Sequence, residues 1–204
     1  RRGSMNAKIT ATGIQGHSAY PDRSNNPIVA MVKLLDKLVS HQLDAGTEHF
    51  DPSTLAITSV DTGNKASNVI PAVTKATINI RFNDSHSGSS LVSWLKDEIE
   101  KVSAEYGIKF KTDFKISGES FITPPGELSD LISKAVKQEL GVTPKLSTTG
   151  GTSDARFIKD MCPVTEFGLV GKTMHAVDEK VETKQINQLK EIYTRILEAY
   201  FEKT

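Results

Sequence analysis

The stretch that decides the fold is Lys75-Ala76-Thr77-Ile78-Asn79-Ile80-Arg81-Phe82, in which polar and apolar residues alternate without interruption. Such alternation is typical of a β-strand with one buried face and one exposed face. The side chains of Ala76, Ile78, Ile80 and Phe82 would therefore face a core. Arg81 is predicted on the opposite, polar face of the same strand.

The segments around this strand complete an order of elements. Residues 7–11, 54–60 and 108–116 show similar β-rich patterns. Two other segments place apolar residues three and four apart, as amphipathic helices do. The first begins at Pro27 and carries Ile28, Met31, Val32, Leu35, Leu38 and Val39; the second carries Leu91, Trp94, Leu95, Ile99 and Val102 and ends near Gly107. The order β-α-β-β-α-β predicts a ferredoxin-like α+β fold. Because each strand keeps a polar face, we expect helices on one side of the sheet only.

Composition excludes several classes of function. The 25 Lys and Arg residues balance 25 Asp and Glu residues, so no net charge favours binding to nucleic acid or to an anionic membrane. Cys162 is the only cysteine and can form neither an internal disulfide nor a thiolate zinc site. No apolar run approaches the ~20 residues that span a bilayer. We expect a protein of a reducing compartment, the cytoplasm.

Residues 117–204 show a different sequence pattern from residues 1–116. A connector rich in Gly, Ser, Thr and Pro precedes a predicted helix that ends at Gly141. Short strands are predicted at Lys145–Ser147 and Val164–Leu169, with a short helix around Phe157 between them and a last helix from Ile186 to Tyr200. These elements suggest an incomplete layered α/β piece, because so few strands would leave an open sheet edge.

Four sites could carry chemistry, and each also has a plain structural interpretation. His17 follows a strand on a predicted loop, where a surface histidine is equally ordinary. The Thr148–Asp154 turn, with Gly151, Thr152 and Ser153, could bind an anion or simply cap a helix. His175 could ligate a metal, although one histidine is not a site. Arg81, with Asn68 on the preceding connection, could bind a carboxylate or be solvated.

These pieces together resemble one family. They are Arg1-Arg2-Gly3-Ser4, Gln15-Gly16-His17-Ser18-Ala19-Tyr20-Pro21, Ser67-Asn68-Val69-Ile70-Pro71, the run from Leu146 to Phe157, and Met174-His175. In spacing and order they are similar to the succinyl-diaminopimelate desuccinylase family of M20-type dizinc metallohydrolases, along essentially the whole chain. The Gly-His-x-x-x-Pro core by itself is shared more widely among related peptidases and deacylases.

The resemblance implies a cytoplasmic bacterial homodimer with two zinc ions per active site and cobalt as a substitute. It implies hydrolysis of N-succinyl-LL-2,6-diaminopimelate, a small-molecule substrate, in lysine and diaminopimelate biosynthesis. His175 would be a zinc ligand, and His17 would stabilise the oxyanion in the active site of the other subunit. Substrate contacts would come from Ser4, Asn68, Arg81, Gly151, Thr152 and Ser153.

The same resemblance divides the chain into a lid or dimerisation domain, residues 1–116, and the C-terminal part of a three-layer catalytic domain, residues 117–204. That family's catalytic domain has a first piece with a His-x-Asp motif and a Glu-Glu pair that includes the general base. Residues 1–204 contain no counterpart of that piece, so we expect a fragment that is inactive alone. Two other interpretations stay open: a fragment of an acetylornithine deacetylase or aminoacylase type of deacylase, and a non-catalytic ferredoxin-like dimerisation module.

Overall fold

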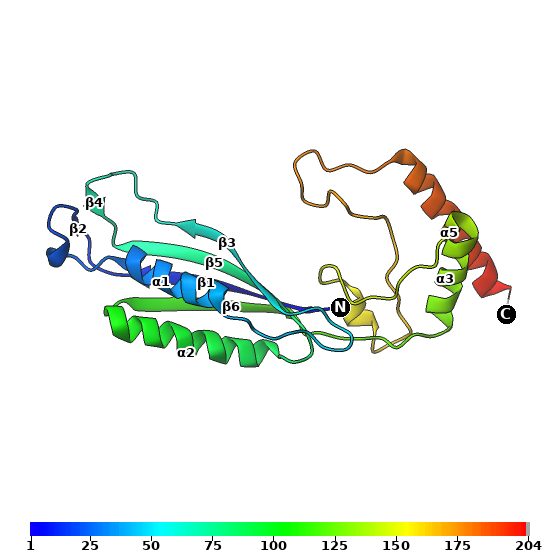
Figure 1. Ribbon diagram of the computed structural model, residues 1–204, viewed down its shortest axis with the longest axis horizontal. Coiled ribbons are helices and arrows are strands. Elements are labelled where there is room, and N and C mark those ends of the chain that lie inside the picture. The colour runs from blue at the N-terminus through cyan, green and yellow to red at the C-terminus, as the bar shows by residue number, and fades with distance from the viewer. Residues whose placement is uncertain (203–204) are drawn as a thin grey trace. The chain divides into compact units, whose positions relative to one another are not determined.

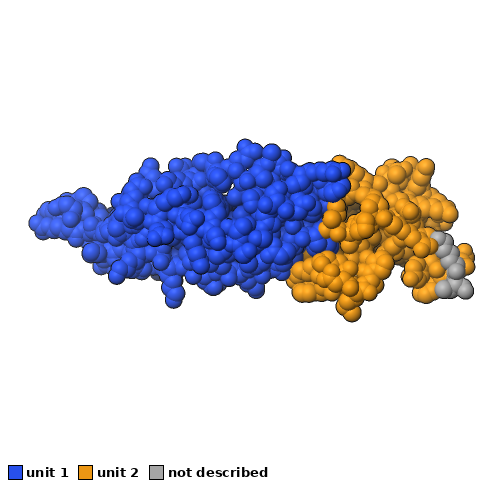
Figure 2. All heavy atoms as spheres, turned by 90° about the horizontal axis from the view of Figure 1, so that it is seen from below, with its two compact units in different colours: residues 1–121, 148–152 blue, residues 122–147, 153–204 orange. Residues whose placement is uncertain are grey.

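The computed structural model describes residues 1–202, which divide into two compact units. Unit 1 comprises residues 1–121 together with residues 148–152, and unit 2 comprises the remaining described residues (Figure 2). The segment 148–152 thus lies with unit 1 although it comes late in the sequence. The domain boundary between residues 116 and 117 stays a prediction.

Unit 1 is built on a four-stranded antiparallel sheet (Figure 1). The strands lie in the order β3-β5-β1-β6. The central pair, β1 and β5, are the first and third of these four strands along the sequence, as the ferredoxin-like order predicts. Their bounds are β1 Gly3–Thr12, β3 Thr54–Asp61, β5 Val73–Phe82 and β6 Lys109–Gly118. The register of β1 with β5 is continuous from Gly3 opposite Phe82 to Thr12 opposite Val73.

Two helices, α1 (Pro27–Ser40) and α2 (Gly88–Tyr106), cover the apolar face of this sheet (Figure 1). Each helix starts with a side-chain cap: Asn26 Oδ1 accepts from Ile28 N at 3.0 Å, and Ser87 Oγ accepts from Ser90 N at 3.1 Å. Buried residues of β1, β5 and both helices form one hydrophobic core. The predicted fold class and the single helical layer are therefore confirmed.

Two details of unit 1 differ from the sequence prediction. Helix α1 buries Ala30 and Leu34, whereas Val32 and Val39, which were predicted on its apolar stripe, are 56% and 49% exposed. A period of 3.6 residues puts Leu34 beside Met31 and Leu38 and turns the two valines away. The prediction also missed a two-stranded ribbon formed by β2 (Gly16–His17) and β4 (Val69–Ile70), whose strands are too short to show any alternation.

Unit 2 contains three helices, α3 (Glu127–Leu140), α4 (Ala155–Ile158) and α5 (Thr183–Phe201). Helices α3 and α5 pack together through a small core. Its buried members are Ile132, Ala135, Val136, Ile192 and Ile196, with Leu128 and Phe167 packed against them. Tyr193 Oη also donates to the carbonyl oxygen of Phe167 at 2.6 Å, which holds this part of the irregular chain against α5.

The strands predicted at Lys145–Ser147 and Val164–Leu169 are wrong: both segments are irregular. Strand geometry persists when backbone groups pair with a neighbouring strand, and no strand of unit 2 is present among residues 122–147 and 153–202 to provide one. Apolar side chains in these two segments remain exposed to solvent: Leu146 is 51% and Leu169 is 45% exposed. None of the helices within residues 1–202 combines the length and apolarity needed to cross a membrane.

Candidate functional site

The β2–β4 ribbon brings together two of the predicted site residues. His17 pairs with Val69, and the amide of Ser18 donates to the carbonyl oxygen of Asn68 at 3.0 Å. The ribbon projects from the end of the sheet at which Thr12 and Val73 lie (Figure 1). His17 and Asn68 therefore share one small surface, which we call the tip group.

The His17 ring is exposed, and its local hydrogen bond sets its tautomer. Nδ1 lies 3.0 Å from the amide nitrogen of Ala19, which donates to it. In the neutral imidazole the proton is then on Nε2, since Nδ1 already accepts. Tyr20 lies edge-on with ring centroids 5.9 Å apart, and the Arg23 guanidinium lies 4.8 Å from the Tyr20 ring centroid. His17 thus presents an N–H donor from the end of strand β2.

The opposite end of the sheet carries a second cluster, the hinge group of Ser4, Arg81 and Thr152. Ser4 pairs with Arg81 across β1 and β5. Ser4 is only 3% exposed, so little of its hydroxyl reaches solvent. Arg81 Nη1 donates to Thr152 Oγ1 at 2.7 Å, a contact between residues 71 positions apart that joins the polar sheet face to the Gly-Gly turn.

Arg81 is also held from within its own strand. Its Nε donates to Asn79 Oδ1 at 3.0 Å, and Asn79 Nδ2 donates to Asn6 Oδ1 on β1 at 3.0 Å. The sequence prediction did not single out either asparagine. The available signal was the two-residue period, which places Asn79 and Arg81 on the same face, but the cross-strand partner Asn6 depends on register.

The segment 148–152 is fastened to the sheet end by further contacts. Thr148 Oγ1 donates to the carbonyl oxygen of His49 at 2.6 Å, and the Arg1 guanidinium donates to the carbonyl oxygen of Thr149. Gly150 has φ +97°, and a Cβ there would overlap the Arg1 guanidinium. Gly151 has open space around it. The positive φ therefore favours glycine at position 150, whereas the predicted role of Gly151 in substrate binding stays a prediction.

The loop that supplies the His49 carbonyl is itself held by Asp44. The Asp44 carboxylate accepts from Asn83 Nδ2 at 2.6 Å and from the amide of Gly46 at 2.7 Å, and its Oδ2 lies 3.1 Å from His86 Nε2. Burial by itself would raise the pKa of Asp44, but hydrogen bonds from Ser53, Gly46 and Asn83 outweigh it and lower the pKa to about 2. Asp44 therefore anchors the loop as a carboxylate.

The two remaining predicted residues belong to unit 2. The Ser153 hydroxyl is buried and has no hydrogen-bond partner among the described residues. His175 is exposed on a loop in the left-handed region, with φ 60°, and its amide donates to Glu179 Oε2 at 3.3 Å. No group of three or more His, Cys, Asp or Glu side chains that could hold a metal occurs within residues 1–202. His175 and its neighbours therefore do not make a zinc site by themselves.

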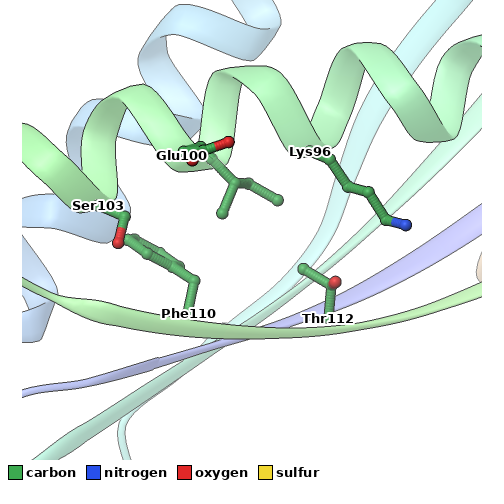
Figure 3. Close-up of a pocket in the computed structure, with 6 residues that line it drawn as sticks. Lys96, Glu100, Ser103, Phe110 and Thr112 are labelled. Carbon is green, nitrogen blue, oxygen red and sulfur yellow. The ribbon is translucent and has the colours of Figure 1, made fainter.

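Hollows in the surface of unit 1 lie elsewhere. A groove of about 260 Å³ runs between α2 and β6 (Figure 3). Its lining consists of Lys96, Ile99, Glu100 and Ser103 from the helix and Phe110 and Thr112 from the strand. None of the predicted site residues lines it, so we do not place the site there.

Within unit 1 the tip group and the hinge group are far apart. Arg81 lies opposite Ser4 near the start of β1, while the ribbon leaves the sheet beyond Thr12. At about 3.3 Å per residue, the strand between these positions is roughly 26 Å long. One copy of unit 1 therefore cannot bring His17 and Arg81 to the same small molecule.

Known proteins match this chain in sequence and in fold. Residues 1–107 match the family of peptidase dimerisation domains. Curated succinyl-diaminopimelate desuccinylases from Ruegeria pomeroyi and Cereibacter sphaeroides are 64% identical to it over 201 residues, which is 98% of this chain and 53% of theirs. The chain thus spans about half the length of the curated relatives it matches.

Solved structures support the fold. A tripeptidase from Staphylococcus aureus has a TM-score of 0.79 at 19% identity and covers 97% of this chain, which covers 52% of it. The dipeptidase Dug1p from Saccharomyces cerevisiae has a TM-score of 0.80 at 16% identity, with 98% and 55% covered. The matched residues 1–107 include three strands of the sheet, both covering helices and the His17 ribbon. They make up more than half of this 204-residue chain. The chain therefore belongs to the family of peptidase dimerisation domains.

Proposed function

We propose that this chain is part of a zinc-dependent amidohydrolase that removes succinate from N-succinyl-LL-2,6-diaminopimelate in lysine and diaminopimelate biosynthesis. Residues 1–116 would form its lid and dimerisation domain, and residues 117–204 the C-terminal part of its catalytic domain. The enzyme would act in the bacterial cytoplasm. The 64% identity to curated desuccinylases supports this choice of substrate over that of a related deacylase.

The separation of His17 from Arg81 carries the proposal of a homodimer. Both residue types suit amide hydrolysis of an anionic substrate, because an N–H donor stabilises the developing oxyanion and a guanidinium binds carboxylate. They lie at opposite ends of one sheet, so a complete site needs His17 from one subunit and Arg81 from the other. The outer strands β3 and β6 leave backbone groups for pairing in the lid domain.

The other predicted residues take roles around these two. Asn68, Gly151, Thr152 and Ser153 would bind substrate carboxylates and the amide, and Ser4 would add a contact near the hinge. His175 would supply one zinc ligand, with the remaining ligands from outside residues 1–202. The described residues of this chain do not form the metal site by themselves.

The activity is tested with the full-length gene product that contains this chain. We expect zinc-dependent hydrolysis of N-succinyl-LL-2,6-diaminopimelate with a kcat/KM far above that for N-acetylornithine. A preference for N-acetylornithine would instead assign the related deacylase function. No hydrolysis of either substrate by folded, zinc-loaded protein would leave the dimerisation module as the explanation.

The shared site is tested by mixing two inactive variants, His17→Ala and Arg81→Ala. Random pairing makes half of the dimers mixed, and each mixed dimer has one intact site of two, so about a quarter of the wild-type activity should return. Refolding or coexpression provides the mixing, and each variant mixed with itself is the control. No recovery in verified mixed dimers would show that both residues act within one subunit.

A further inference from the structure

We propose that Asn79, supported by Asn6, is a positioning residue that aims the Arg81 guanidinium while leaving its positive charge for a substrate carboxylate. This inference rests on the function proposed above and assigns part of its specificity for an anionic substrate. It concerns two side chains that do not themselves touch the substrate.

The geometry of the three side chains is directional. Asn79 Nδ2 donates to Asn6 Oδ1 at 3.0 Å and to the carbonyl oxygen of Met5 at 3.3 Å. Both acceptors fix the orientation of the amide, so that Oδ1 is the atom that faces Arg81 Nε, 3.0 Å away. With Nε held by Asn79 and Nη1 by Thr152 Oγ1 at 2.7 Å, two of the three guanidinium nitrogens are tied and the plane of the group is fixed.

The groups that hold Arg81 are all neutral. Its partners are an amide oxygen and a hydroxyl oxygen, and no Asp or Glu forms an ion pair with it among the described residues. Arg195 in unit 2 gives the contrast, because its Nη2 lies 3.3 Å from Glu139 Oε2. A carboxylate partner would orient a guanidinium equally well but would cancel most of its attraction for an anionic ligand.

The three residues Asn6, Asn79 and Arg81 form a prearranged cluster on one face of the sheet. Asn6, Asn79 and Arg81 lie on the polar face of the sheet, opposite the face that packs on the helices, and Asn6 is directly across from Asn79 in the register of β1 and β5. Arg81 and Asn79 are partly buried. A long side chain that rotates freely loses conformational entropy when a ligand fixes it, and this loss lowers the affinity. The preformed contacts of Arg81 avoid that loss.

The test compares Asn79→Asp and Asn79→Ala in the full-length enzyme. Asn79→Asp keeps an acceptor of the same shape but adds a negative charge beside Arg81, and we expect KM for the succinyl substrate to rise about tenfold or more while kcat changes less than about twofold. Asn79→Ala removes the orientation but leaves the charge, so its KM should rise by less. The matched control is Thr77→Asp, which adds the same charge on the same strand face opposite Lys8.

The outcomes separate the inference from the proposed function. Wild-type enzyme without desuccinylase activity would defeat the proposed function, whereas active wild type with an unchanged KM in Asn79→Asp would overturn only this inference. So would an equal KM rise in Thr77→Asp, or a larger rise in Asn79→Ala than in Asn79→Asp. If circular dichroism shows that Asn79→Asp does not fold, the Asn79→Ala variant provides the test. A KM equal to that of the wild type in Asn79→Ala would then overturn the inference.

An N-acetyl analogue of the substrate identifies which substrate carboxylate Arg81 binds. It lacks the succinyl carboxylate but keeps the diaminopimelate ones. A KM rise in Asn79→Asp that is confined to the succinyl substrate assigns Arg81 to the succinyl group. An equal rise with both substrates assigns it to a diaminopimelate carboxylate, and both results support the inference.

Discussion

At the scale of single residues, His17 shows how a backbone contact sets the chemistry of a side chain. The Ala19 amide donates to Nδ1 and so leaves Nε2 as the donor of the neutral ring. A surface histidine without this contact would sample both tautomers. The hydrogen bond is therefore consistent with the proposed role of His17 toward an oxyanion.

Replacing His17 by Ala should lower kcat of the full-length enzyme by about 10²–10³, because one oxyanion donor is worth that much in rate. Zinc content should stay unchanged. Steady-state kinetics and metal analysis of the same samples measure both quantities. If zinc content fell while the rate per bound zinc did not, His17 would be a metal ligand.

Gly150 and Gly151 offer a matched pair. Gly150→Ala should destabilise the 148–152 segment by about 1–2 kcal/mol, because its φ of +97° is a backbone conformation that L side chains rarely adopt. Gly151→Ala meets open space and should leave the segment as stable as before. Hydrogen exchange of residues 148–152 in both variants is the measurement. Equal exchange in the two would contradict the geometric requirement for Gly150.

At the scale of elements, the loop between α1 and β3 is an ordered structure held by one carboxylate. The Asp44 carboxylate joins the loop to the connection after β5 through Asn83, whose side chain is fully buried. The same loop provides the His49 carbonyl that fastens Thr148. The polar network therefore links the stability of a loop to the position of the Gly-Gly turn.

The stability of this chain should depend on pH through Asp44. Its pKa is about 2 in the folded protein and 3.8 in its ordinary state, so the carboxylate stabilises the fold above about pH 4 and this contribution disappears as the pH falls through about 2. Its size is roughly 2 kcal/mol. Asp44→Asn should remove most of this dependence, as measured by urea unfolding at pH 7, 4 and 3.

The control for that measurement is Asp36→Asn, on the exposed side of α1. Its unfolding curves should follow those of the wild type at each pH. A full pH dependence retained in Asp44→Asn would assign the acid sensitivity to another group.

At the scale of the whole molecule, the two units differ in how completely they bury their apolar residues. Unit 1 has a continuous core of strand and helix residues with near-zero exposure, such as Ile78, Leu34 and Leu95. In unit 2, Met161 is 83% and Val177 is 93% exposed. Such open apolar surface usually marks an interface with another protein segment.

Hydrogen exchange of the 204-residue chain should therefore be strongly uneven. We expect slow exchange in β1 and β5 and fast exchange at residues 159–182, where the backbone forms no helix or strand. Light scattering on the same sample gives the oligomeric state. Strong protection of residues 159–182 in a verified monomer would show a complete core of its own in the C-terminal part.

The sequence alone determined the fold of unit 1 because its signals are local. The alternation in 75–82, the spacing of apolar residues in the two helices and Gly107 at the end of α2 depend on neighbours a few residues apart. The resemblance supplied the expected roles of the site residues, among them His17 and Arg81. The predicted strands in residues 145–147 and 164–169 were wrong. A short apolar run favours strand conformation, but a strand also needs a partner strand to pair with.

Only the tertiary structure decided how these residues are grouped. Asn6 reaches Asn79 through the register of two strands far apart in sequence, and Thr152 reaches Arg81 because a segment near residue 150 returns to unit 1. The same register puts His17 and Arg81 at opposite ends of the sheet. Local sequence patterns contain no information about such long-range pairing, because the free energy that selects it comes from packing and hydrogen bonds between segments that the chain brings together only on folding.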